Sequence, residues 1–440
     1  MKSLKQILLN RSTNHPCWIV CGYGVITAKD LVYILSVQDF EPWRGKRVAL
    51  GELPALELLL SLIFLDGLAE SIVFLPSEYD DASQEMLLSQ FSIDIKLDGN
   101  GLNLTELTKT KCPTKGQLSF DPIVLNTTKW FLPTSGTTGV PKLIQHTFSS
   151  LSCKMKPSSS EIVKKWGSLY SMKRFAGLQV FLQAWVSGDA FLVIKDNADF
   201  STKLQFLAEN GCNALSATPS MWRKISMYPK FDDLDLKQIT LGGEIIDQFI
   251  LDHLRKKFLN ARITHIYAST EVGFGFSVKD GLAGFPIRYL TNNPSGIQFK
   301  VSDENKLFFN LKSSSSVDSK NNWIDSGDVV KIQNDRVYFL GRANGSINVG
   351  GNKVMPEEVE SIIKEMEEIL FVQVKSRRNS FLGSLVEAIV VLKDGIDLNA
   401  SLKKKIITHC SDKLESFKVP AILRTSRNIK FTATGKVDRN

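Results

Sequence analysis

The most informative stretch of this chain reads Phe131-Leu132-Pro133-Thr134-Ser135-Gly136-Thr137-Thr138-Gly139-Val140-Pro141-Lys142. After the apolar residues Phe131 and Leu132, the stretch contains hydroxyl side chains, two glycines and a lysine within one turn. The glycines allow backbone conformations and close approaches that a side chain would forbid, so backbone N–H groups and hydroxyls can converge on anionic oxygens. The stretch therefore predicts a phosphate-binding turn. Its candidate ligand-binding residues are Thr134, Ser135, Gly136, Thr137, Thr138, Gly139 and Lys142.

Two other nucleotide-binding motifs are incomplete in this sequence. A Walker A loop needs a second glycine five residues after the first, and counting from Gly136 places Pro141 there. A dinucleotide-binding motif that begins with Gly22-Tyr23-Gly24 lacks its third glycine. An ordinary surface turn rich in serine, threonine and glycine would have the same composition. The remaining segments of the chain decide between that turn and a phosphate site.

Four further segments follow in order. They are Tyr267-Ala268-Ser269-Thr270-Glu271, Asp325-Ser326-Gly327-Asp328, Gly341-Arg342-Ala343-Asn344 leading to Val349-Gly350-Gly351, and Thr432-Ala433-Thr434-Gly435-Lys436-Val437-Asp438-Arg439. In order and spacing, the five segments together resemble the signature blocks of the adenylate-forming superfamily. That superfamily contains acyl- and aryl-CoA synthetases, adenylation domains of peptide synthetases, and luciferases. The resemblance runs from about Trp130 to the end of the chain, and it is closest in character to a compact acyl-CoA ligase.

The apolar pattern predicts an α/β fold. Short apolar runs at 47–50, 71–75 and 191–194 each precede a longer helical stretch, at 53–65, 82–91 and 201–210. This alternation is typical of covered, largely parallel sheets. After about residue 296, short β segments and a polar loop at 312–322 replace it. The resemblance implies a large N-terminal ATP- and acid-binding domain over residues 1–341, which includes this β-rich subdomain, and a small mobile α+β C-terminal domain over residues 342–440.

Beyond Arg342 the pattern predicts a compact α+β unit. We expect a short strand pair, a helix at 357–368 that Pro356 can start, a strand at 386–392 and a helix at 399–414. The resemblance implies that this unit rotates against the large domain between two half-reactions. Its hinge follows Arg342, where Asn344 replaces the usual hinge acid or lysine and still tolerates unusual backbone torsions.

Composition and charge exclude several classes of protein. The chain has 440 residues, of which 43% are hydrophobic and 23% charged, enough for a large domain and a smaller one. The apolar run at 53–65 is too short and too charged to span a bilayer. Residues 1–12 make a poor secretory signal, so we expect a cytoplasmic protein without a membrane span. Basic residues are spread along the chain, so the net charge of +8 fits small anionic substrates and no nucleic acid.

The six cysteines indicate reduced thiols. Their spacing builds neither a disulfide framework nor a zinc cluster. Cys17 and Cys21 lie near His15, but these side chains do not complete a tetrahedral metal site.

The resemblance implies ATP-dependent activation of a carboxylic acid. The acid attacks the α-phosphate of ATP, pyrophosphate departs, and acyl-AMP then passes its acyl group to CoA or to the phosphopantetheine thiol of an acyl carrier protein. Negative charge grows on the transferring phosphate, so the enzyme must supply cations and oriented donors there. The alternative is a non-enzymatic nucleotide-binding relative that acts as a sensor or partner.

The resemblance also assigns roles to individual positions. Lys436 matches the catalytic lysine, and its retention argues against the non-enzymatic alternative. Glu271 matches the residue that binds Mg²⁺, a hard cation that prefers carboxylate oxygen, and Thr270 is expected to contact phosphate. Asp328 matches the acceptor for both ribose hydroxyls, and Arg342 matches a donor to the same sugar.

Further roles concern the adenine and the thiol. Tyr267 is expected to stack on adenine, with Gly242-Gly243-Glu244 as the opposite wall. Gly350 and Gly351 resemble the paired glycines that line the pantetheine channel when the small domain closes. Lys430 and Phe431 replace the usual proline and basic residue before the catalytic loop.

The region expected to bind the acid departs from the family pattern. Segment 168–177 stands where many relatives have an aromatic–histidine pair, or an aspartate that holds an α-ammonium group, and it contains neither histidine nor aspartate. An α-amino acid is therefore disfavoured, whereas Lys173 or Arg174 could meet an anionic group on the acid. The candidate pocket residues are Tyr170, Arg174, Phe175, Gly177 and Ala268, the last of which replaces a usual glycine.

Overall fold

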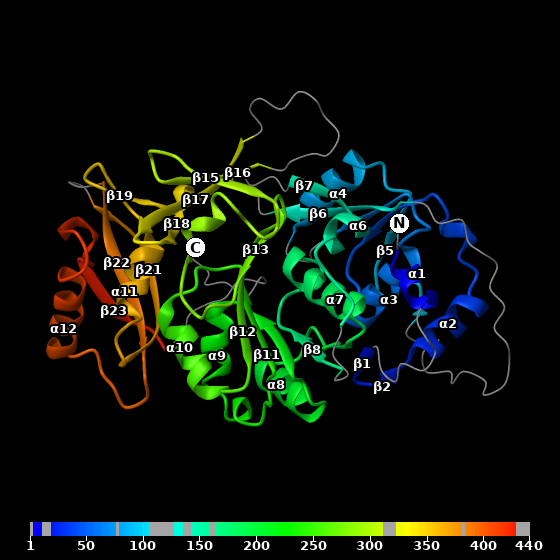
Figure 1. Cartoon of the computed structure of the whole chain (residues 1–440), viewed down its shortest axis with the longest axis horizontal. Helices are drawn as coiled ribbons and strands as arrows, with labels where there is room; N and C mark the ends of the chain where they lie inside the picture. Colours follow the sequence, from blue (N-terminus) through cyan, green and yellow to red (C-terminus); the bar gives the residue numbers. More distant parts are fainter. Residues whose placement is uncertain are drawn as a thin grey trace. The chain divides into compact units, whose positions relative to one another are not determined.

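The computed structural model describes residues 3–10, 19–75, 79–99, 101–104, 127–134, 142–158, 163–310, 323–379 and 383–427 (Figure 1). The chain divides into two compact units. The first comprises Met1–Ala217, Tyr228–Thr240 and Ser269–Phe274. The second comprises Thr218–Met227, Leu241–Ala268 and Gly275–Asn440. Both units combine helices with sheets (Figure 1).

One sheet of the first unit contains the strands that flank the candidate phosphate-binding turn. Its elements are β3 Arg47–Leu50, α3 Ala55–Leu65, β4 Ser71–Phe74, α4 Asp81–Gln90, β5 Ile95–Leu97, β6 Lys129–Thr134 and β7 Lys142–Thr147. The strand order is β5-β3-β4-β6-β7. The first four strands pair in parallel, and β7 pairs antiparallel with β6. The helices α3 and α4 connect parallel strands, which confirms the alternation predicted for residues 47–91.

A second sheet contributes the strands that precede the candidate acid-binding segment. In the described residues this sheet has eight strands, in the order β13-β12-β11-β10-β8-β9-β1-β2. Its strands up to residue 242 are β1 Ile19–Cys21, β2 Gly24–Ile26, β8 Lys165–Ser168, β9 Ala190–Leu192, β10 Ala214–Ala217 and β11 Gln238–Gly242. The helices of this unit outside the first sheet are α1 Leu4–Asn10, α2 Ala28–Val37, α6 Phe148–Ser152, α7 Phe175–Ser187 and α8 Phe200–Glu209. The pairs β8–β9, β8–β10 and β1–β9 are parallel, as the sequence pattern predicts for covered sheets.

The apolar run at 53–65 forms the core helix α3. Its residues 56–65 are all buried, so the run packs inside the unit. The following Asp66 carboxylate accepts hydrogen bonds from the backbone N–H of Leu4 at 2.8 Å and from the indole N–H of Trp130 at 3.0 Å. Burial raises the pKa of this carboxyl to about 6. These bonds join α1 and β6 to the end of α3.

The described part of the chain contains no helix long and apolar enough to cross a bilayer. Within the same residues, no group of three or more histidine, cysteine, aspartate or glutamate side chains is arranged to hold a metal ion. The thiols of Cys21, Cys153, Cys212 and Cys410 are free. Cys17 and Cys112 lie outside the described residues.

The second unit begins with a helical region and continues with a β-rich sheet. Its first elements are α9 Pro219–Ile225, α10 Gln248–Lys257, β12 Arg262–Ser269 and β13 Gly273–Val278. The sheet elements are β14 Phe285–Pro286, β15 Gln298–Val301, β16 Lys306–Asn310, β17 Trp323–Gln333 and β18 Arg336–Arg342, in the order β14-β18-β17-β16-β15. All neighbours in this sheet are antiparallel, which confirms the predicted change to β structure. The polar loop at 312–322 lies outside the described residues.

The C-terminal segment contains more β structure than the sequence pattern predicts. Its elements are β19 Ile347–Val349, β20 Asn352–Val354, α11 Pro356–Ile363, β21 Ile369–Asn379, β22 Gly383–Leu392, α12 Ala400–Ser411 and β23 Ile422–Thr425. The helix predicted at 357–368 was too long, because α11 ends at Ile363 and β21 starts at Ile369. The strand β21 was not predicted. The strand at 386–392 starts earlier, at Gly383, and the helix at 399–414 ends earlier, at Ser411.

The C-terminal segment has a hydrophobic core of its own. Val354, Ile363, Val374, Val390 and Ile406 belong to one buried cluster whose members all lie between residues 347 and 423. The sheet order β20-β19-β22-β21, with β23 parallel to β22, places this cluster beneath α11 and α12. The segment belongs to the second compact unit, so the domain boundary at Arg342 stays a prediction.

Candidate active site

The ends of the candidate phosphate-binding turn lie side by side. Thr134 ends β6, Lys142 starts β7, and the two residues are paired across the strands. The Thr134 hydroxyl donates to the backbone carbonyl of Lys142 at 3.3 Å. The Lys142 side chain is exposed and available to an anion. Residues 135–139, which hold the predicted glycines and hydroxyls, lie outside the described residues.

Thr270 and Glu271 lie in the turn between β12 and β13. The Ser269 hydroxyl accepts a hydrogen bond from the backbone N–H of Val272 at 3.1 Å, and this bond closes the turn. Gly273 follows with a φ of +71°, a backbone conformation that side chains disfavour. The Glu271 side chain is exposed, so its carboxylate is open to a cation.

His146 is a candidate site residue that the sequence analysis missed. Its Nε2 atom lies 2.8 Å from the carbonyl oxygen of Thr270, and its ring centroid lies 6.0 Å from that of Phe175. Burial lowers the pKa of His146, against the opposing effects of the bond to Thr270 and the charge of Glu271. The family pattern places a histidine in segment 168–177, which contains none. A strand brings His146 to Phe175 instead.

The structure brings Asp328 and Arg342 together, and their roles toward the ribose stay predictions. They are paired across β17 and β18, with Arg342 Nε 3.6 Å from Asp328 Oδ1. Arg342 also donates from Nη2 to the backbone carbonyl of Ser326 at 2.8 Å. The hydroxyl of Tyr267 donates to Asp328 Oδ2 at 2.7 Å. The carboxylate is therefore held in place by a phenol and a guanidinium.

Tyr267 has aromatic neighbours on this chain. Its ring is stacked on Phe276 and on Phe339, each at a centroid distance of 5.1 Å, and it meets Phe299 edge-on. Burial and the charge of Asp328 raise the pKa of Tyr267, so the phenol keeps its proton and remains a donor. Stacking of this ring on adenine stays a prediction. The hydrogen bond from Tyr267 to Asp328 was not predicted from the sequence.

The predicted wall at Gly242-Gly243-Glu244 follows β11. Gly243 has a φ of +81°, so the chain turns there in a conformation that favours glycine. The Glu244 carboxylate accepts a hydrogen bond from the backbone N–H of Ser220 at 2.9 Å, in the first turn of α9. This bond holds the Glu244 side chain against the first turn of α9.

The predicted hinge and channel residues lie in tight turns. Asn344 is exposed in a short 3₁₀ turn after β18. Gly350 and Gly351 have φ values of +57° and +90° between β19 and β20, and Gly351 donates its N–H to the Asn348 side chain at 2.9 Å. The turn itself requires this glycine pair, so its channel role stays a prediction. Lys436 lies outside the described residues.

The candidate acid-binding segment is closely packed. Tyr170 and Phe175 are each 8% exposed, and the Arg174 guanidinium lies 5.4 Å from the ring centroid of Tyr79. A Cβ atom at Gly177 would lie 2.2 Å from the carbonyl oxygen of Ser171. Gly177 therefore has a packing role, because it lets α7 approach the turn that follows β8. The half-buried Ala268 lies on β12 in the other unit.

We expect the substitution Gly177→Ala to lower the free energy of unfolding by about 1–3 kcal/mol, the usual cost of overpacking. The new methyl group would force apart α7 and the backbone of Ser171. Urea denaturation of purified protein measures the effect. The neighbouring change Ala176→Gly is the control and should cost no more than about 1 kcal/mol. Equal stability of Gly177→Ala and the parent protein would contradict the packing role.

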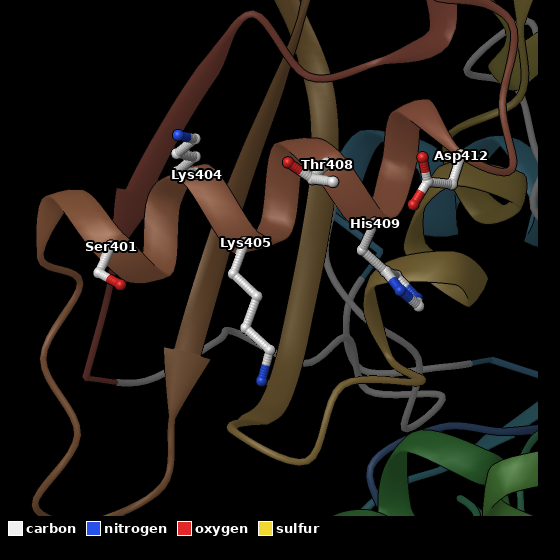
Figure 2. Close-up of a pocket in the computed structure, with 6 residues that line it drawn as sticks. All are labelled: Ser401, Lys404, Lys405, Thr408, His409 and Asp412. Atoms are coloured by element: carbon white, nitrogen blue, oxygen red, sulfur yellow. The ribbon is translucent and has the colours of Figure 1, made fainter.

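A surface depression on α12 contains none of the predicted site residues. It is lined by Ser401, Lys404, Lys405, Thr408, His409 and Asp412 (Figure 2). Five of these side chains come from α12, and Asp412 follows its last residue (Figure 2). Lys405 pairs with Glu368, and His409 Nε2 lies 2.9 Å from a Glu365 oxygen. These contacts join α12 to the turn after α11.

Two family matches cover most of the chain. Residues 71–307 match the AMP-binding enzyme family, and residues 358–436 match the AMP-binding enzyme C-terminal domain. The chain is 25% identical over 348 residues to the mitochondrial acyl-coenzyme A synthetase ACSM4 of Rattus norvegicus, a match that covers 70% of this chain and 59% of the rat protein. It is 23% identical over 357 residues to a D-alanine–D-alanyl carrier protein ligase of Staphylococcus aureus, covering 73% of each.

Solved structures share the fold. An anthranilate CoA ligase in complex with anthranoyl-AMP matches with a TM-score of 0.79 and 16% identity, over 99% of this chain and 95% of that one. A benzoate CoA ligase from Burkholderia xenovorans matches with a TM-score of 0.76 and 17% identity, over 99% of each chain. These likenesses confirm the expected large α/β region and the smaller C-terminal region.

Proposed function

Because the chain belongs to the AMP-binding enzyme family of adenylate-forming ligases, we propose that it activates a carboxylic acid with ATP and passes the acyl group to a thiol. The observation that carries the proposal is the match to both family regions, 71–307 and 358–436. The relatives named above are ligases, which lends no support to the non-enzymatic alternative.

The proposed reaction has two steps. A carboxylate oxygen attacks the α-phosphorus of ATP, the bond from that phosphorus to the bridging oxygen breaks, and pyrophosphate leaves. The thiol sulfur then attacks the acyl carbon, loses its proton, and displaces AMP. The first step concentrates negative charge on the transferring phosphate, so it depends most on cations and oriented donors.

The described residues supply the parts of this chemistry that concern the nucleotide. Asp328 is held by Tyr267 and Arg342, and we assign it to the ribose hydroxyls. We assign Lys142 to the phosphates. Glu271, exposed on its turn, would hold Mg²⁺, which would neutralise phosphate charge. Thr270, Lys436 and the glycines at 350 and 351 keep the roles that the resemblance implies.

The substrate is proposed only as a class. The anthranilate and benzoate CoA ligases named above act on aryl acids, and the Staphylococcus aureus relative is a ligase for D-alanine. Segment 168–177 contains no aspartate to hold an α-ammonium group, so we propose an acid without an α-amino group. The acceptor is CoA or a carrier-protein phosphopantetheine, which present the same thiol arm.

The deciding experiment measures carboxylate-dependent pyrophosphate release. The protein is incubated with Mg-ATP and a panel of aryl, short-chain, medium-chain and amino acids, each with and without CoA. We expect release with one class of non-amino acid. Acceleration by CoA would identify an acyl-CoA ligase, and a signal that ignores CoA would favour a carrier-protein acceptor. Silence across the panel, in protein that is folded, would count against the proposed function.

The substitution Asp328→Asn should weaken ATP binding about 10- to 100-fold, because a charge-assisted acceptor contributes about 1.5–3 kcal/mol. The amide would also leave the guanidinium of Arg342 without its anionic partner. Isothermal titration calorimetry with ATP measures the change. Asp335→Asn is the matched control, because Asp335 is exposed at the opposite end of the same strand pair. Unchanged affinity in Asp328→Asn would remove Asp328 from the nucleotide site.

A further inference from the structure

One hydrogen bond joins two segments that lie 124 positions apart in the sequence. His146 Nε2 lies 2.8 Å from the carbonyl oxygen of Thr270. A carbonyl oxygen can only accept, so Nε2 carries the proton in this contact. Both residues belong to the first compact unit. The imidazole of His146 is therefore fixed as an N–H donor toward the turn between β12 and β13.

The turn that receives this bond is short and bears Glu271 at its tip. Inside the turn, the Ser269 hydroxyl accepts from the N–H of Val272. From outside, His146 restrains the carbonyl of the residue just before Glu271. The Thr270 carbonyl is coplanar with the N and Cα atoms of Glu271, so the bond also restrains the backbone atoms from which the Glu271 carboxylate extends.

The same strand connects this turn to the candidate phosphate-binding turn. Lys142 and His146 are four residues apart on β7, and alternate residues of a strand share one face. Lys142 and His146 therefore lie on the same side of the sheet. Lys142 follows the candidate phosphate-binding turn, so His146 orders the Glu271 turn on the face where Lys142 projects.

A third segment meets the same imidazole. The Phe175 ring lies 6.0 Å from the His146 ring, centroid to centroid, with a tilt of 44°. Phe175 is the first residue of α7 and is 8% exposed. Packing against this ring limits the rotation of the imidazole, whose Nε2 atom faces Thr270. His146 thus contacts the acid-binding segment and the Glu271 turn with one side chain.

We propose that His146 is a positioning residue that sets the direction of the Glu271 carboxylate through its hydrogen bond to the Thr270 carbonyl. The inference rests on the proposed function, in which Glu271 holds the Mg²⁺ that accompanies ATP. His146 acts through the Thr270 backbone and contacts no reacting atom. Partners that orient metal ligands typically change metal affinity or activity by about 10- to 100-fold, which sets the scale of the expected effect.

Two variants separate the hydrogen bond from the packing of the ring. His146→Phe keeps an aromatic ring beside Phe175 and removes the donor, whereas His146→Gln keeps an N–H donor at a similar reach. ATP binding is measured by calorimetry, with Mg²⁺ and with EDTA. We expect His146→Phe to bind Mg-ATP about tenfold more weakly than the parent, with no change in EDTA. His146→Gln should recover most of the loss, and both variants should melt as cooperatively as the parent protein.

Activity provides the second readout. In pyrophosphate release with saturating acid, His146→Phe should need about tenfold more Mg²⁺ for half-maximal rate, with a smaller change in the KM for the acid. A rise confined to the KM for the acid would assign His146 to the acid pocket and overturn the proposal. Equal losses in His146→Phe and His146→Gln would also overturn it, because the N–H donor that glutamine keeps would then restore nothing.

The ring nitrogens allow a test that does not depend on activity. In ¹⁵N-labelled parent protein, the shifts of His146, identified by its loss in His146→Phe, should report a proton on Nε2. A proton on Nδ1 alone would overturn the inference, whatever the activity. Parent protein that binds ATP and releases pyrophosphate, together with an unaffected His146→Phe, would overturn the inference and leave the proposed function intact. Parent protein that does neither would overturn both.

Discussion

Replacing Lys436 with alanine should lower the rate of acyl-AMP formation by about 10²–10³-fold, the usual loss when one group that stabilises transition-state charge is removed. Negative charge grows on the α-phosphate as the carboxylate attacks and pyrophosphate leaves, and the proposed role of Lys436 is to offset that charge. ATP binding should change little, because the phosphate charge in the ground state is shared with Mg²⁺. Acid-dependent pyrophosphate release and ATP calorimetry on the same preparation measure the two quantities.

Lys430→Ala is the matched control for this experiment. It removes a lysine six residues earlier in the same C-terminal segment, and we expect pyrophosphate release to stay within about twofold of the parent rate, as for most solvated lysines. Thiol transfer from separately prepared acyl-AMP should also survive in Lys436→Ala, since that step breaks no bond to a polyphosphate. Pyrophosphate release at the parent rate in Lys436→Ala would contradict the assignment of Lys436 as the catalytic lysine.

The parallel sheets were predictable because their strands are buried on both faces. A buried parallel strand forms a continuous apolar run, and the connecting helix follows within a few residues. The runs at 47–50 and 71–75 therefore locate β3 and β4 to within one residue. The helix predicted at 53–65 starts at Ala55, because Leu53 and Pro54 belong to the entry turn and Pro54 caps the helix.

The C-terminal segment shows where local pattern fails. Residues 364–368 are lysine, glutamates and methionine, which favour helix, so the sequence extends α11 by a turn. The pairing of the following strand with β22 overrides this local helix propensity. β21 runs from Ile369 to Asn379 and pairs along most of its length with β22, and Glu360 in α11 accepts the backbone N–H of Val374. The chain must leave the helix early to enter this sheet.

The candidate site also contains some contacts that local sequence predicts and others that it does not. Asp328 and Arg342 were predictable as neighbours because their motifs stand at the ends of one β-hairpin, where register alone pairs them. The contacts of Tyr267 with Phe339, and of His146 with Thr270, depend on packing between segments far apart in the sequence. No spacing rule relates such pairs, so only the fold identifies them.

The substitution Asp247→Ala should lower the free energy of unfolding by about 3–5 kcal/mol, the typical cost of removing one partner of a buried ion pair. Arg223 Nη2 donates to both oxygens of Asp247 at 2.7 Å, and the two side chains are only 8% and 14% exposed. Asp247 also caps α10 by accepting the backbone N–H of Ile250. Alanine would leave the guanidinium buried without an anion and the helix without its cap.

Urea denaturation at neutral pH measures this loss, and Asp252→Ala on the exposed side of α10 is the control, with an expected cost below about 1 kcal/mol. Burial alone would raise the pKa of Asp247, but the charges of Arg223 and Lys364 and the hydrogen bonds from Arg223 and Ile250 together lower it. A lowered folded-state pKa stabilises the fold fully above the unfolded value of about 3.9, and the contribution is lost as the pH falls through the folded value. The difference in free energy of unfolding between Asp247→Ala and the parent protein should therefore become smaller at acidic pH. A gap below about 1 kcal/mol at pH 7 would mean that water reaches the guanidinium of Arg223 and replaces the lost carboxylate.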